Sequence, residues 1–426
     1  MNAFKVVQTA SDSMELSVSH MPTLVSPRLM FFDLAVGGHH ATYIRYLVQY
    51  WVKQKLDGSL IFLVSPDFLE KHSDVVSLAS DLIEFITISD EENRQLKKQK
   101  SIIKCAFLEW NLFCTYARNL KIEKGFLLYF DYLQLPIVFG QLSPCPFSGI
   151  YFRPTFHYST FEGHVDTFKD TWRGWRQKIL LALAMRNKRF LGLLSLDAYA
   201  VPYIEKIVPK DKFVSHLPDP VDISEVADDS VYQLKKELHI EENRKVFLLF
   251  GRLTERKGIY QVLDAMKSLK PEISKKCCLL LVGEIPDNIY RNIEDSIELL
   301  NNNLKIQVII KEGYQKEENI PAYFSIADVI LAPYQNHVGM SGIIVLGMAY
   351  EKVIMASSYG LMGEFVKRYS NGICLAENSS DEIVYKISKF LATDHLNEKS
   401  NNNGKVLTKK FCPYLFGDTI INSVLA

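Results

Sequence analysis

Apolar runs of strand length alternate with helix-length segments along both halves of the chain. In the first half, we expect strands at 29–35, 59–65, 84–89, 125–131 and 148–153. In the second half, we expect them at 245–251, 278–283, 305–311, 328–334 and 353–358. Short apolar runs separated by segments of helical period are typical of parallel sheets that helices cover on both faces. The pattern therefore predicts an α/β chain made of two Rossmann-like units.

A polar segment with two prolines separates the two series of strands. Residues 213–222 read FVSHLPDPVD, a composition that suits a linker. We therefore expect an N-terminal domain at 1–212 and a C-terminal domain at 213–409, each long enough to bury its own core. Residues 410–426 have apolar positions at helical spacing but no strand left to cover. We expect this last segment to pack back on the N-terminal domain.

Composition changes this picture by excluding several classes of protein. Lys plus Arg equals Asp plus Glu at 49 each, so no overall charge favours a nucleic-acid partner. The seven cysteines have no C-x-x-C spacing, so we expect neither a zinc site nor a disulfide framework. No apolar run approaches the roughly 20 residues that span a bilayer, and residues 1–27 do not have the pattern of a signal peptide. We expect a cytoplasmic protein.

The turns that follow the strands are where we expect chemistry, because ligands of such sheets bind beyond the carboxyl ends of the strands. Arg252 comes directly after the strand 245–251, and Lys257 precedes the next helix. Two cations beside a helix N-terminus predict a diphosphate site. The alternative is a solvated charged turn.

Later turns of the second half carry further signals. Groups that suit a nucleoside follow the next two strands, at Glu284, Gly313 and Tyr314, although an ordinary turn fits these residues equally well. Gly339, Ser341 and Gly342 open another helix, whose N–H groups and the Ser341 hydroxyl suit phosphate oxygens. The alternative is a tightly packed helix with Ser341 as its N-cap.

The first turn of the N-terminal half is rich in glycine and histidine. Gly37 and Gly38 form a tight turn but no G-x-G-x-x-G fingerprint, so a bound dinucleotide is not indicated. Adjacent histidines make poor metal ligands. For His39 and His40 we therefore expect either a polar role at a cleft or no role in binding.

Two patterns in these turns resemble those of glycosyltransferases with the GT-B fold, in particular the retaining family 4. The G-R-L-x-x-x-K-G pattern of that family is matched from Gly251 to Gly258, and its A-D-V-x-x-x-P-[SY] pattern is matched from Ala327 to Tyr334. The resemblance is strongest at 213–390.

One departure from the family pattern concerns a pair of glutamates eight residues apart. Val338 and Leu346 stand at the corresponding positions. The loop resembles a branch of the family in which a Ser-Gly pair, here Ser341 and Gly342, is present instead.

The resemblance implies a GT-B fold, in which two Rossmann-like domains face a central cleft. It implies transfer of a sugar from a UDP- or GDP-linked donor to a glycan, lipid-linked or small-molecule acceptor, with retention and without a metal or cofactor. Donor-binding residues are expected on the C-terminal domain at Gly251, Glu284, Gly313, Tyr314, Tyr334, His337, Gly339, Met340, Ser341 and Gly342. Acceptor-side residues are expected at Gly37, Gly38, His39, His40 and Asp131. The catalytic groups it implies are Arg252, Lys257, Arg153 and His157; for the last two, an ion pair and a surface position are the alternatives.

Alternatives to this activity stay open. A GT-B scaffold without turnover, partnering an active enzyme, fits the missing glutamates, and a phosphorylase or a sugar-nucleotide epimerase would use the same fold. Residues 171–190 place Trp172 and Trp175 on one helix face among basic residues. This pattern predicts either a covering helix of the first domain or peripheral contact with the inner face of a membrane.

Overall fold

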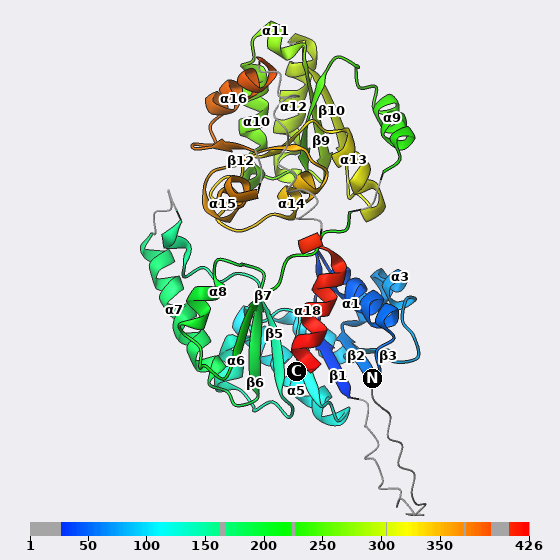
Figure 1. Cartoon of the computed structure of the whole chain (residues 1–426), viewed down its shortest axis with the longest axis vertical. Coiled ribbons are helices and arrows are strands. Elements are labelled where there is room, and N and C mark those ends of the chain that lie inside the picture. The colour runs from blue at the N-terminus through cyan, green and yellow to red at the C-terminus, as the bar shows by residue number, and fades with distance from the viewer. Residues whose placement is uncertain are drawn as a thin grey trace, which may run out of the picture.

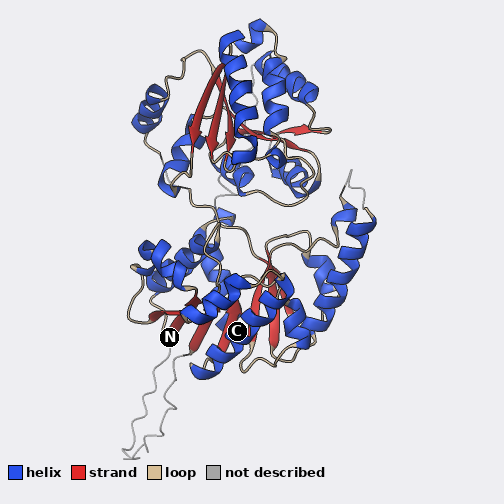
Figure 2. Cartoon of the chain, turned by 180° about the vertical axis from the view of Figure 1, so that it is seen from behind, coloured by secondary structure: helices blue, strands red, loops and turns tan. Residues whose placement is uncertain are grey.

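The computed structural model describes residues 27–161, 167–223, 226–303, 305–369, 372–392 and 409–425. It contains two α/β domains, one above the other in Figure 1, each with a parallel sheet covered by helices. Seen from behind in Figure 2, the strands of both domains again lie between helices. The predicted α/β class with two Rossmann-like domains is confirmed.

The N-terminal sheet has seven strands in the order β3-β2-β1-β4-β5-β6-β7. Its strands are β1 (Arg28–Phe32), β2 (Ser59–Val64), β3 (Ile83–Thr87), β4 (Lys124–Leu127), β5 (Phe147–Tyr151), β6 (Phe190–Ser195) and β7 (Phe213–His216). Its helices are α1 (His40–Gln54), α2 (Pro66–Lys71), α3 (Ser73–Val76), α4 (Asp90–Lys98), α5 (Ile102–Asn119), α6 (Gln134–Phe139), the 3-10 turn η1 (Tyr158–Thr160), α7 (Phe168–Met185) and α8 (Val201–Glu205). The central strands are nearly all buried, as uninterrupted apolar runs in a doubly covered sheet require.

The C-terminal sheet has six strands in the order β10-β9-β8-β11-β12-β13. Its strands are β8 (Lys245–Phe250), β9 (Cys277–Gly283), β10 (Gln307–Glu312), β11 (Val329–Ala332), β12 (Val353–Ser357) and β13 (Ile373–Leu375). Its helices are α9 (Asp228–Glu237), η2 (Glu255–Lys257), α10 (Ile259–Lys267), α11 (Pro271–Ser274), α12 (Asp287–Asn303), η3 (Glu317–Asn319), α13 (Ile320–Ile326), α14 (Gly342–Ala349), α15 (Gly360–Tyr369) and α16 (Ser380–Ala392). The five predicted strands of this half are all present, and β13 is an additional short edge strand.

The predicted linker begins too early. Phe213 opens β7, which pairs in parallel with β6, so the N-terminal sheet extends to His216. A Cβ at Gly192 of β6 would lie 2.4 Å from the main-chain oxygen of Phe213, so glycine permits this close pairing. The strand was missed because it is short and only half buried, which leaves little apolar signal. The predicted helix 171–190 likewise ends at Met185, before β6 begins.

Helix α18 (Pro413–Leu425), red in Figure 1, packs beside α1 of the N-terminal domain. Its buried side chains, which include Phe416, Ile420 and Val424, belong to the same apolar core as those of α1. The Tyr50 hydroxyl of α1 donates a 2.7 Å hydrogen bond to Asp418. A Cβ on Gly417 would lie 2.6 Å from the Tyr50 Cβ, so the two helices approach closely at this glycine.

The chain passes between the domains a first time after β7 and a second time before α18. The two crossings meet, because the Val221 N–H donates a 2.7 Å hydrogen bond to the Phe411 carbonyl. Among the helices of the described ranges, none combines the length and apolar character needed to cross a bilayer.

Candidate functional site

The turn after β8 buries a lysine beneath the end of its strand. Lys257 is only 6% exposed, and its Nζ donates a hydrogen bond to the Phe250 carbonyl. Gly251 has a φ of 94°, and a Cβ there would lie 2.4 Å from the Lys257 Nζ. Glycine is therefore needed twice over, for its backbone conformation and for the space that the lysine occupies. Burial, followed by the charge of Arg256, lowers the pKa of Lys257 to about 7.

Tyr334 connects this lysine to the turn before α14. Its buried ring lies 5.6 Å from the Lys257 Nζ and 5.2 Å from the Arg256 guanidinium carbon. Its hydroxyl is 3.0 Å from the Ser341 Oγ. Ser341 is the N-cap residue of α14, as the alternative expected, but its side chain makes no capping hydrogen bond to the helix. A Cβ on Gly342 would meet no atom within 4 Å, which leaves open space at the start of the helix.

A hollow lies at the carboxyl ends of β8, β9 and β10. Its lining includes Arg252, Glu284 and Gly313, three predicted site residues that lie on separate turns. Gly313 has a φ of 96°, and a Cβ there would meet no atom within 4 Å. Tyr314 is 74% exposed and is not among the residues that line this hollow.

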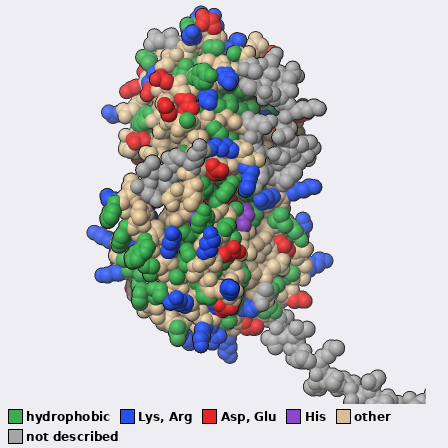
Figure 3. All heavy atoms as spheres, turned by 60° about the vertical axis from the view of Figure 1, so that its left-hand side comes forward, with side chains coloured by type: hydrophobic (Ala, Val, Ile, Leu, Met, Phe, Trp, Pro, Cys, Tyr) green, Lys and Arg blue, Asp and Glu red, His purple; other side chains and the backbone are tan. Residues whose placement is uncertain are grey.

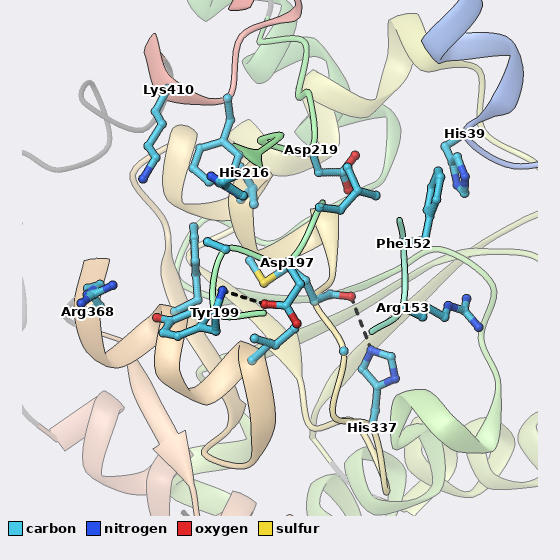
Figure 4. A pocket seen from close by; sticks show the side chains of 18 of the residues that line it. His39, Phe152, Arg153, Asp197, Tyr199, His216, Asp219, His337, Arg368 and Lys410 are labelled. Atoms are coloured by element: carbon cyan, nitrogen blue, oxygen red, sulfur yellow. Dashed lines mark hydrogen bonds between the residues drawn. The ribbon is translucent and has the colours of Figure 1, made fainter. Parts of the chain in front are cut away.

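Another pocket lies between the two domains (Figure 4). The N-terminal domain and the first crossing contribute His39, Tyr43, Phe152, Arg153, Tyr158, Leu196, Asp197, Ala198, Tyr199, His216 and Asp219. The C-terminal domain and the second crossing contribute His337, Gly339, Met340, Val345, Leu361, Phe365, Arg368, Lys410 and Phe411. The pocket thus unites residues from turns that are far apart in the sequence.

Cations from both domains act on His337 in this pocket. Burial, followed by the charges of Arg256, Arg153 and Lys257, lowers the pKa of His337 to about 4. The imidazole is therefore uncharged at neutral pH, and Arg256, Arg153 and Lys257 are near enough to affect it by their charge. Such an arrangement favours a bound anion.

His39 lies on the N-terminal side of the pocket and stacks on Phe152, with ring centroids 4.8 Å apart. Burial, followed by the charges of His40 and Arg153, lowers the pKa of His39 to about 4. His40 places its Nδ1 2.6 Å from a carboxylate oxygen of Asp33, which holds the ring at the end of β1. Gly37 and Gly38 precede these histidines, and Cβ atoms at either glycine would meet nothing within 4 Å.

Asp131 supports the pocket rather than lining it. Its carboxylate accepts main-chain hydrogen bonds of 2.8 Å from Phe152 and from Arg153, so it fixes the backbone of both lining residues. Burial raises the pKa of Asp131 to about 6.

His157 is 1% exposed, and its Nε2 lies 2.9 Å from an oxygen of Asp197. The surface position considered for His157 is therefore wrong. Asp197, and not His157, is the member of this pair that lines the pocket. Its other carboxylate oxygen accepts hydrogen bonds from the N–H groups of Tyr199 and Ala200.

Several lining residues are not predicted from the sequence, among them Asp197, Tyr199, His216, Asp219, Arg368 and Lys410. Asp197 and Tyr199 follow β6, and His216 ends β7, so recognition of these two strands would have indicated them. Nothing in the local sequence of Arg368 or Lys410 indicates a position facing the other domain.

Comparisons with known proteins agree with this architecture. Residues 231–407 match the family described as "Glycosyl transferases group 1". The structure of HepE from Anabaena in complex with UDP aligns with a TM-score of 0.64 at 13% identity, over 93% of this chain and 99% of that one. WaaG, a glycosyltransferase involved in lipopolysaccharide biosynthesis, aligns with a TM-score of 0.64 at 12% identity, over the same shares of the two chains. The chain has the GT-B fold.

The sequence relatives match only part of this GT-B chain. A lipopolysaccharide 1,2-N-acetylglucosaminetransferase of Salmonella typhimurium is 31% identical over 162 residues, which are 37% of this chain and 42% of that protein. The chain spans about half the length of the curated relatives it matches.

Proposed function

We propose that the protein is a glycosyltransferase that moves a sugar from a nucleoside-diphosphate sugar to an acceptor hydroxyl. The observation that carries the proposal is the buried Lys257 near Tyr334, whose hydroxyl contacts Ser341. Arg256 and Arg153 add positive charge near His337 of the interdomain pocket. Buried and converging positive charge is costly unless an anion compensates it. A diphosphate is the anion that a strand-to-helix turn of this kind binds best.

The geometry supports donor binding by the C-terminal domain and acceptor binding by the N-terminal domain. The hollow at Arg252, Glu284 and Gly313 has room for the nucleoside, and the open start of α14 has N–H groups for the phosphates. The sugar would then extend toward His337 and the interdomain pocket. The N-terminal domain would present the acceptor from the other side of that pocket.

The chemistry follows from the charge that develops on the leaving group. As the glycosidic bond breaks, negative charge grows on the departing phosphate, and fixed cations stabilise it without reorganising. We infer that no metal is needed, because Arg252, Arg256 and Lys257 neutralise the diphosphate directly. We also infer retention, in which the departing phosphate takes the proton of an acceptor that attacks from the same face.

The nature of the donor is suggested by the comparisons. HepE was solved with UDP, and the Salmonella relative is named for transfer of N-acetylglucosamine. We therefore favour a UDP-linked donor, with UDP-N-acetylglucosamine and UDP-glucose as the first to test.

Calorimetry with UDP and GDP, followed by release of UDP from the two donors in the presence of water alone, tests the proposal. We expect UDP to bind at micromolar concentration and slow hydrolysis of at least one donor. Failure of both nucleotides to bind would overturn the diphosphate assignment. Tight UDP binding without hydrolysis or transfer to any acceptor would instead favour a scaffold. The anomeric configuration of a transferred sugar, read by NMR, decides between retention and inversion.

A further inference from the structure

Helix α7 of the N-terminal domain exposes a stripe of large apolar side chains. Phe168, Trp172, Trp175 and Ile179 are spaced four, three and four residues apart, so they share one face of the helix. Their exposed fractions are 86%, 55%, 64% and 38%. The two tryptophans therefore do not belong to the core, although α7 is a covering helix of the first domain through its buried side chains. We call these four residues the α7 stripe.

Basic side chains border the α7 stripe. Lys169, Arg173 and Arg176 are all exposed, and the Arg176 guanidinium carbon lies 5.4 Å from the centre of the Trp172 ring. Asp170 is the one acidic residue of α7, and its carboxylate accepts hydrogen bonds from Thr167 at the N-cap. Figure 3 brings this side of the molecule forward and shows hydrophobic and basic side chains together on the lower domain.

The opposite face of α7 is fixed to the loop that leads into the interdomain pocket. Gln177 accepts hydrogen bonds from the Thr155 N–H and hydroxyl at 3.0 and 2.6 Å, and it donates one to the Arg153 carbonyl at 3.2 Å. Gly174 and Leu181 are buried on the same side. The helix is thus held firmly from within, and the α7 stripe faces outward.

We propose that the α7 stripe docks on an anionic lipid bilayer. Tryptophan and phenylalanine beside lysine and arginine suit the interface between headgroups and acyl chains, where rings are buried and cations meet lipid phosphates. A second copy of the same surface is disfavoured as the occupant. Each α7 has four basic residues and one acidic residue, so two such surfaces would repel each other. Since Gln177 of α7 also holds the loop of Arg153, docking attaches the N-terminal wall of the interdomain pocket to the membrane. This proposal does not depend on the reaction proposed above.

Sedimentation of the full chain with vesicles tests the proposal. The vesicles are pure phosphatidylcholine or an equal mixture of phosphatidylcholine and phosphatidylglycerol. We expect binding to the mixed vesicles and little to pure phosphatidylcholine, with loss of binding at high salt. Replacement of both rings, Trp172→Ser with Trp175→Ser, should weaken binding by roughly tenfold or more per ring. Charge reversal, Arg173→Glu with Arg176→Glu, should weaken it by at least roughly fivefold per cation.

A matched control is available on the other domain. Tyr232 and Tyr385 are 62% and 61% exposed, so Tyr232→Ser with Tyr385→Ser removes two exposed rings away from α7. This control should bind vesicles as the wild type does. Intrinsic fluorescence gives a second readout, because Trp51 and Trp110 are buried and only Trp172 and Trp175 are placed to respond to lipid. Binding unchanged by the tryptophan pair, or absent from mixed vesicles, would overturn the proposal. So would a dimer in solution that the same pair of substitutions abolishes.

Discussion

The ammonium group of Lys257 donates a hydrogen bond to the carbonyl of Phe250, the last residue of β8. The lysine is thereby fixed at the carboxyl edge of the sheet, under the ring of Tyr334. An ammonium group fixed in this way can stabilise charge on a leaving diphosphate without a change of conformation.

Replacement of this lysine tests its part in the reaction. Lys257→Ala should lower kcat by roughly 10² to 10³, because one preorganised cation is removed from the developing charge. Arg252→Lys should not restore full activity where Arg252→Ala lowers it, since an ammonium group lacks the two-pronged grip of guanidinium on phosphate. Steady-state UDP release with saturating donor is the measurement. Lys275→Ala, on the exposed surface of the same domain, is the control and should keep wild-type turnover. Wild-type kcat in folded Lys257→Ala would refute the assignment.

The stability of the protein should depend on pH through Lys257. Its folded pKa is about 7, whereas a lysine in the unfolded chain keeps its ordinary value of 10.5. Between these values the unfolded state binds more protons, so the free energy of unfolding should rise with pH by up to about 1.4 kcal/mol per unit. Below about pH 7 the lysine is protonated in both states, so the free energy of unfolding no longer changes with pH through this group.

Urea unfolding of the wild type and of Lys257→Met, measured at several values between pH 6 and pH 10, isolates this effect. The stability of the wild type relative to the variant should increase with pH above 7. Parallel curves for the two proteins would show that the buried lysine does not titrate in this window.

Two glycines of α14 should respond oppositely to alanine. Gly342→Ala places its Cβ in open space, so the fold should gain up to about 1 kcal/mol of stability while UDP affinity falls. Gly347→Ala places its Cβ 2.4 Å from Ile354 and 2.9 Å from Ile330, so it should lose about 1–3 kcal/mol through overpacking. Thermal unfolding and UDP calorimetry on both variants separate the two effects. A Gly342→Ala protein with unchanged UDP affinity would argue against phosphate binding at the start of this helix.

The contact between α18 and α1 should be sensitive to one methyl group. Gly417→Ala would bring a Cβ to 2.6 Å from the Tyr50 Cβ and should destabilise the protein by about 1–3 kcal/mol. Asn422→Ala changes an exposed position of the same helix and should be nearly neutral. Equal melting temperatures for the two variants would mean that this contact is loose.

The proposed independence from metal has a direct test. EDTA should leave donor hydrolysis unchanged, because the diphosphate is neutralised by side-chain cations. Loss of activity in EDTA that magnesium or manganese restores would contradict this prediction.

The residues of the site that can be predicted from the sequence are those whose pattern lies within a single turn. Arg252 and Lys257 can be recognised together because a strand, a glycine and two cations follow one another in the chain. Asp197 could not be recognised in this way, because its place depends on β6, a strand whose apolar run continues a helical pattern. Arg368 and Lys410 could not be predicted from any local pattern, since only the approach of the two domains brings them to the pocket.

The position of α18 in the sequence means that it is synthesised long after α1, the helix on which it packs. The helix that covers α1 is made after the whole of the C-terminal domain, although both helices belong to one apolar core. At about 5–20 residues per second, the outer side of α1 waits on the order of tens of seconds for its cover. Until then the first sheet is a nascent intermediate with exposed apolar surface. Chaperones that bind such surface are therefore expected to retain the growing chain until α18 emerges.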